Sequence, residues 1–88
     1  MSSKETLMVF PCDFQIKVIG NNQETFANDV IAIARQYYPT LTNANIKRQP
    51  SQQANYLAIT LTVHAEDQPT LDALYAELTK HPDTKMVL

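Results

Sequence analysis

The stretch that most constrains the fold is residues 56–65, where large apolar side chains alternate with smaller or polar ones. One face of this stretch carries large aliphatic side chains, namely Leu57, Ile59, Leu61 and Val63. The other face carries Tyr56, Ala58, Thr60, Thr62 and His64. A period of two is typical of a β-strand with one buried face, and β-branched residues favour a pleated, half-buried surface. We therefore expect a central strand whose apolar face is covered by the rest of the chain.

A first strand and a first helix are predicted ahead of this stretch. Residues 13–20 alternate in the same way, with an apolar face made of Phe14, Ile16 and Val18. The chain's only glycine, Gly20, closes this strand, where it supplies a positive φ or allows close approach of the backbone. Asn21 or Asn22 is expected to cap the helix, and Asn21 with Glu24 approximates a capping box. An apolar helical stripe follows, and Pro39 ends the helix.

The remaining elements are a hairpin, a second helix and a last strand. Residues 44–49 predict a weaker edge strand, and the polar turn at residues 50–55 joins it to the central strand. Asp67 or Gln68 is expected to cap the second helix, with Pro69 in its first turn and Pro82 after its end. Residues 84–88 predict a short strand whose apolar end, Met-Val-Leu, finishes inside the sheet.

This order of elements predicts an α+β fold of the ferredoxin-like type. Strand, helix, strand, strand, helix, strand (βαββαβ) gives a four-stranded antiparallel sheet in the order 4-1-3-2, with two helices on one face. We expect residues 1–10 to be a flexible segment and residues 11–88 to form a single domain. A domain of this size has a thin stability margin, so dimerisation is a reasonable expectation.

The composition of the chain limits the classes of function that it can have. The chain has 88 residues and a net charge of −2, without a basic block that would attract nucleic acid or acidic lipid. Cys12 is the only cysteine, which excludes an internal disulfide and fits a reducing compartment. The first apolar run, residues 7–10, is too short for a signal peptide core or a membrane span. We expect a soluble, cytoplasmic protein that binds neither nucleic acid nor membrane.

Several motifs together resemble one bacterial family. Phe10-Pro11-x-x-Phe14-x-x-Lys17-Val18-x-Gly20 resembles the opening of the YbeD-like family. The run from Asn55-Tyr56 to Ile59-Thr60-Leu61-Thr62 resembles its central strand, and Tyr75-x-Glu77-Leu78 with Met86-Val87-Leu88 resembles its end. Ala54 and Ala58 depart from the glycine and serine expected in many relatives. The resemblance covers nearly the whole chain.

The resemblance carries expectations about fold and role. It implies a ferredoxin-like fold close to the ACT-type regulatory domains of amino-acid metabolism. Members of the family are often encoded near lipoate-synthesis enzymes, which hints at a pathway, and no established activity comes with the family. The expectation is therefore a non-catalytic regulatory module that senses a small metabolite. The alternative is a protein–protein interaction module, with a possible link to lipoate metabolism.

Catalysis, metal binding and cofactor binding find little support in the residues. A nucleophilic Cys–His pair needs Cys12 within reach of His64 or His81, and no recognised spacing supports this. One cysteine and two scattered histidines lack the spacing of a zinc site. The loop after the first strand has no arginine, which argues against acylphosphatase activity. Tyr56 is the only aromatic residue expected on the uncovered sheet face, so the base-stacking platform of an RNA-binding domain is missing.

Two candidate binding regions remain. The first is the loop of Gly20, Asn21 and Asn22, where amide groups and a helix N-terminus suit a carboxylate, although strand-to-helix capping alone explains these residues. The second is the uncovered sheet face, predicted to consist of Gln15, Lys17, Ile19, Tyr56, Ala58, Thr60, Thr62 and His64. Its centre carries few charges, so we expect it to pack against another copy of the chain or against a partner protein.

Overall fold

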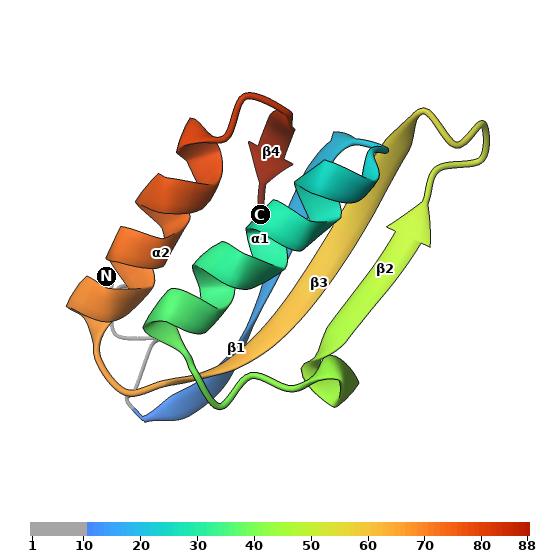
Figure 1. The fold of residues 1–88 in the computed structure, drawn as a ribbon. Helices are drawn as coiled ribbons and strands as arrows, with labels where there is room; N and C mark the ends of the chain where they lie inside the picture. Colours follow the sequence, from blue (N-terminus) through green and yellow to red (C-terminus); the bar gives the residue numbers. More distant parts are fainter. Residues whose placement is uncertain (1–10) are drawn as a thin grey trace, which may run out of the picture.

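The strand predicted at residues 56–65 lies inside the sheet, between two antiparallel neighbours. The computed structural model describes residues 11–88. Strand β3 (Tyr56–Ala65) pairs with β1 (Cys12–Asn21) on one side and with β2 (Ile46–Pro50) on the other. Strand β4 (Thr84–Val87) joins the free edge of β1, so the strand order is β2-β3-β1-β4 (Figure 1). This confirms the predicted order 4-1-3-2, which is the same arrangement read from the opposite edge of the sheet.

Both helices cover the same face of this sheet. Helix α1 (Glu24–Tyr37) packs across the β1–β3 pair, and α2 (Gln68–Lys80) lies beside it, as Figure 1 shows. The predicted apolar faces meet between the two layers. The core consists of Ile16, Val18, Phe26, Ala27, Val30, Ala34, Tyr38, Leu41, Leu57, Ile59, Leu61, Val63, Ala65, Leu71, Leu74 and Leu78. Burial of large apolar side chains at roughly 1.5–3 kcal/mol each is the main force that holds the layers together.

The two helices begin in different ways. Asp67 caps α2, because its carboxylate accepts the backbone N–H of Thr70 at 2.8 Å, as predicted. This hydrogen bond lowers the pKa of the Asp67 carboxyl. The predicted cap of α1 is wrong: the N-cap is Gln23, whose side chain makes no capping hydrogen bond. Asn21 belongs to β1, and its side chain reaches the loop before β4 instead.

Strand β2 begins two residues later than predicted. A single 3₁₀ turn, η2 (Asn43–Asn45), precedes it. The Asn45 amide oxygen accepts the hydroxyl of Thr42 at 3.0 Å, and the Asn45 N–H donates to the Thr42 carbonyl at 2.9 Å. Such local bonds of Asn and Thr compete with strand pairing, which explains why Ala44 and Asn45 leave the sheet.

The end of the chain also differs from the prediction. Of its three apolar residues, Val87 packs against the core, whereas Met86 is 50% exposed and Leu88 is 59% exposed. Side chains alternate between the two faces of a strand, so β4 can direct only one of these three residues toward the helices. The expectation that the whole Met-Val-Leu end lies inside the sheet is therefore wrong.

Two predictions concern the chain's surroundings and its first residues. Across residues 11–88, neither helix is long and apolar enough to cross a membrane. The predicted flexible segment, residues 1–10, lies outside the described residues.

Candidate functional site

Gly20 stands at the crowded junction between β1, α1 and the loop before β4. Its φ is not in the positive region, so the second of the two predicted roles applies. A Cβ atom at this position would overlap the carbonyl oxygen of Asp83 and the ring of Phe26. The missing side chain therefore lets α1 and the α2–β4 loop approach the end of β1.

The two asparagines that follow Gly20 tie separate loops to this junction. The Asn21 side chain donates to Asp83 Oδ1 at 3.0 Å, and its backbone N–H donates to the Asp83 carbonyl at 3.0 Å. The Asn22 side chain donates to the carbonyl of Ala54 at 2.9 Å, and its N–H donates to the carbonyl of Asn55 at 3.1 Å. Both side-chain amides therefore hold neighbouring loops in place.

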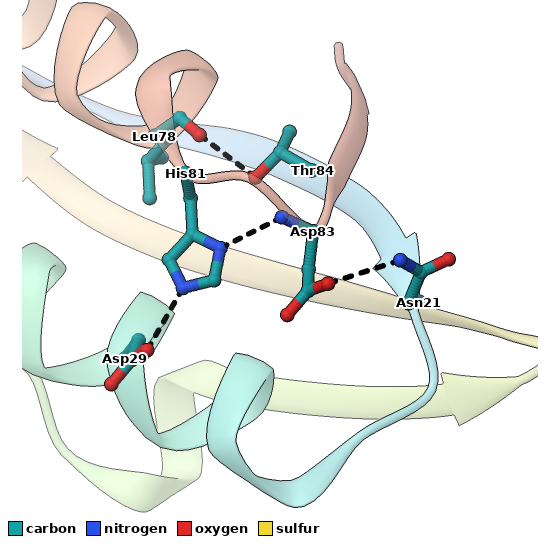
Figure 2. A network of polar contacts seen from close by, with 6 residues as sticks. All are labelled: Asn21, Asp29, Leu78, His81, Asp83 and Thr84. Carbon is teal, nitrogen blue, oxygen red and sulfur yellow. Dashed lines mark hydrogen bonds and ion pairs between the residues drawn. The ribbon is translucent and has the colours of Figure 1, made fainter.

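His81 extends this network from the end of α2 to α1. Figure 2 shows its ring between Asp29 and the backbone of Asp83. The Asp83 N–H donates to Nδ1 at 3.1 Å, so Nδ1 is the acceptor and Nε2 carries the proton. Nε2 then donates to Asp29 Oδ2 at 2.8 Å. The ring also meets Phe26 edge to face, with the centroids 5.5 Å apart.

Asp83 and Thr84 complete the junction. The Thr84 hydroxyl donates to the carbonyl of Leu78 at 2.8 Å, which fixes the start of β4 against the last turn of α2 (Figure 2). In the sequence analysis, His81 was considered only as a possible partner of Cys12, and its bond to Asp29 was missed because it joins residues far apart in the chain. The ligand-binding role of Gly20, Asn21 and Asn22 stays a prediction, and their observed contacts are structural.

The uncovered sheet face is the second candidate region, and here the register brings the predicted residues together. Lys17 pairs with Thr60, and Thr60 pairs with Lys47 on the other side. This lysine row crosses three strands with the Thr60 side chain in the middle. Gln15 and Thr62 form the next row toward the start of β1.

An apolar band lies beside the lysine row. Ile19 pairs with Ala58 on one side and with Met86 on the other. The exposed large apolar side chains among residues 11–88 are Tyr56 at 46%, Met86 at 50% and Leu88 at 59%. Tyr56 and Met86 belong to this band, and Leu88 lies beside Lys17, with which it exchanges two backbone hydrogen bonds. We call the lysine row and the apolar band together the open face.

Lys47, Met86 and Leu88 were missing from the predicted open face. The sequence could have indicated them, because side chains alternate between the two faces of a strand. Once the strand order is known, the alternation in residues 46–50 and 84–88 places these three residues on the open face. Thr60, Thr62, Ala58 and Ile19 are half-buried by their neighbours on the face, and the other predicted residues are exposed.

At the far end of the open face, His64 Nδ1 lies 3.0 Å from Asp13 Oδ1. Cys12 pairs with Ala65, one position along, so its side chain is on the helix-covered side of the sheet. The register therefore separates Cys12 from His64. Among residues 11–88, no group of three or more histidine, cysteine or acidic side chains is arranged to hold a metal ion.

Comparison with known proteins gives the chain its relatives. A UPF0250 protein of Ralstonia nicotianae is 40% identical over 85 residues, covering 97% of this chain and 88% of the relative. A UPF0250 protein of Paraburkholderia phytofirmans is 38% identical over 87 residues, covering 99% and 98%. The family described as "Protein of unknown function (DUF493)" matches residues 5–88. The chain belongs to the DUF493 family. This confirms the resemblance to YbeD-like proteins.

Solved structures place the fold of this DUF493 chain among ACT-like domains. The solution structure of protein HP0495 from H. pylori matches with a TM-score of 0.74 at 13% identity, covering 98% of this chain and 90% of that one. The ACT domain from GTP pyrophosphokinase of Chlorobium tepidum matches with a TM-score of 0.69 at 15% identity, covering 88% and 97%. At these identities the likeness concerns the fold, and it confirms the ferredoxin-like, ACT-like architecture.

Proposed function

We propose that this chain is a non-catalytic regulatory module that binds a partner protein through its open face. The observation that carries the proposal is the position of Tyr56, Met86 and Leu88, which all lie on or beside this one face. Exposed apolar side chains gathered on one surface are typical of protein-binding sites, whereas scattered ones need no explanation.

The charges of the open face select the chemistry of the partner. Lys17 and Lys47 flank Thr60, and the carboxylate of Asp13, on the same face of the sheet, is already paired with His64. A partner surface with carboxylates opposite the lysine row and apolar side chains opposite the band complements this pattern. A second copy of the chain offers the same lysines, so its charges match less well.

The geometry also favours binding over catalysis. Cys12 and His64 are on opposite sides of the sheet, and His81 is engaged with Asp29 and Asp83 at the other end of the strands. On the open face, Tyr56 is the aromatic side chain on which a base could stack, and a net charge of −2 does not favour binding to nucleic-acid phosphates. These features support a role that needs neither a nucleophile nor a nucleic acid.

Thr60→Glu tests the proposal at the centre of the face. The substituted carboxylate lies between two lysines, so the fold is retained while an acidic partner is repelled. Affinity capture by the tagged full chain from a lysate of its own organism, quantified by mass spectrometry, should lose the specific partner. Ala32→Glu, on the exposed side of α1, is the matched control and should keep it.

Light scattering on the purified chain separates the two kinds of partner. The proposal expects a monomer, together with a captured partner whose binding weakens at high salt, since the lysine row is exposed to screening. A homodimer that Thr60→Glu dissociates would replace the proposed partner by a second copy. Capture that is identical for wild type, Thr60→Glu and Ala32→Glu would refute a role for the open face.

A further inference from the structure

A cleft lies at the end of the molecule opposite to the Gly20 junction, where β1 begins and β3 ends. Its larger part has a volume of about 280 Å³ and is lined by residues that include Tyr37, Tyr38, Thr40, Glu66, Asp67 and Thr70. A smaller hollow of about 100 Å³, which adds Asp13 and Asn45, shares Tyr38, Thr40 and His64 with it. Small-molecule sites have volumes of roughly 300–1,000 Å³, so the cleft suits a ligand of few atoms.

Tyr38 lines both parts of this cleft and carries a polar group without a hydrogen-bond partner among the described residues. Its side chain is only 8% exposed, and its hydroxyl is buried without a hydrogen-bond partner among the described residues. Burial raises the pKa of the phenol, and the negative charges of Asp67 and Glu66 raise it further. A buried hydroxyl without a partner opposes folding and needs a compensating role.

The acidic side chains that line the cleft are those of Asp13, Glu66 and Asp67. Glu66 is exposed and forms no ion pair with any residue of the described part of the chain. In the neutral ring of His64, Nδ1 donates to the Asp13 carboxylate, which leaves the lone pair of Nε2 as an acceptor. No lysine or arginine is found among the described residues that line the cleft. The site is thus anionic.

We propose that this cleft binds a small organic cation, a primary alkylammonium group, between Tyr38 and Glu66. The ammonium supplies three donors, which the Tyr38 hydroxyl, the Glu66 carboxylate and His64 Nε2 can accept. Tyr37 and Tyr38 line the cleft, and aromatic side chains favour a cation with an alkyl chain. A metal ion fits less well, because the carboxylates of Asp13 and Asp67 are engaged by His64 and by the Thr70 amide.

This site is separate from the proposed protein-binding surface. The open face is centred on Thr60 and its lysines, whereas the cleft is built from the end of α1, the start of α2 and the end of β3. Failure of either proposal leaves the other in place, and Thr60→Glu should not change ammonium binding.

The test is an amide NMR titration of the ¹⁵N-labelled full chain with n-butylammonium chloride. Saturable shifts are expected for the amides of Thr40, Glu66 and Thr70, which line the cleft. Sodium n-butyrate has the same alkyl chain and the opposite charge, so it should leave these amides unshifted. Magnesium chloride tests for a metal site. Linear shifts with n-butylammonium, equal shifts with butyrate, or tighter binding of magnesium would overturn the proposal.

Two variants define the contacts. Glu66→Gln keeps the shape of the side chain and removes its charge, so the Kd for n-butylammonium should rise by about tenfold. Tyr38→Phe removes only the buried hydroxyl and should raise the Kd by about fivefold. Tyr75→Phe removes a hydroxyl outside the cleft and is the matched control, with an unchanged Kd. An unchanged Kd in both cleft variants would show that the cation binds elsewhere.

Discussion

At the end of the sheet where β1 finishes, polar groups satisfy one another, whereas at the opposite end a buried hydroxyl lacks a partner. The first end holds Asn21, His81 and Asp83, linked by hydrogen bonds of 3.0 and 3.1 Å around a glycine with no room for a side chain. The second holds Tyr38 and Glu66 beside an open cleft. Polar side chains are present at both ends, but a buried group is left without a hydrogen-bond partner at the second end.

This difference separates residues that maintain the fold from residues that are available to bind. Glycine and asparagine after a strand suggest a ligand loop by residue type, yet here their polar groups are engaged within the chain. Tyr38 belongs to the apolar core, yet its hydroxyl has no partner among the described residues. Checking which buried polar groups have hydrogen-bond partners therefore identifies the candidate site better than residue type does.

The largest expected effect is at the crowded end. Gly20→Ala should lower the free energy of unfolding by about 3 kcal/mol, because the added methyl group displaces the Asp83 carbonyl or the Phe26 ring. Urea denaturation of the purified chain measures it. Lys17→Ala, a substitution at an exposed position on the open face of the same strand, is the control and should change stability by less than about 0.5 kcal/mol. Equal stability of the two variants would contradict the close packing at Gly20.

The two histidine–aspartate pairs give a second, smaller contrast. The His81 side chain is 11% exposed and pairs with Asp29 at 2.8 Å, whereas the His64 side chain is 57% exposed and pairs with Asp13 at 3.0 Å. His81→Ala should cost about 2 kcal/mol, since it removes two hydrogen bonds and the contact with Phe26. His64→Ala should cost at most about 0.5 kcal/mol, as expected for an exposed pair.

A double-mutant cycle sharpens this contrast. His81→Ala with Asp29→Ala should show a coupling energy of about 1 kcal/mol, and His64→Ala with Asp13→Ala should be additive within about 0.3 kcal/mol. Urea denaturation of the single and double variants at one pH supplies all the values. If the His81 pair is additive as well, the junction is held by packing alone and the polar network contributes little.

Most of the fold could be predicted from the sequence because it follows from local periodicity. The alternation at residues 56–65 and the stripe that begins at Phe26 place the core strand and its cover, and strand order follows from the order of elements. The errors lie where a side chain has more than one possible hydrogen-bond partner. Asn45 bonds to Thr42 and leaves the strand, and Asn21 bonds to Asp83 rather than to the helix start.

The binding regions could be predicted only in part, for a related reason. The centre of the open face follows from alternation, so Lys17 and Thr60 were placed correctly. Lys47 and Met86 join it only through the register between strands, which no single stretch of sequence contains. The cleft at Tyr38 depends on where the end of one helix meets the start of another, and its decisive feature is a missing hydrogen bond, which residue spacing cannot indicate.

The smallest predicted effect has the opposite sign to the others. Tyr38→Phe should raise the free energy of unfolding by about 1 kcal/mol, because it removes a buried hydroxyl that has no partner and keeps the ring. Tyr75→Phe is the control: its hydroxyl makes only a long contact of 3.4 Å with the Leu88 carbonyl, so stability should change by less than about 0.5 kcal/mol. Urea denaturation of both variants without added amine decides the matter. A loss of stability in Tyr38→Phe would mean that the hydroxyl already has a partner inside the protein, and the cleft would then resemble the satisfied end of the sheet.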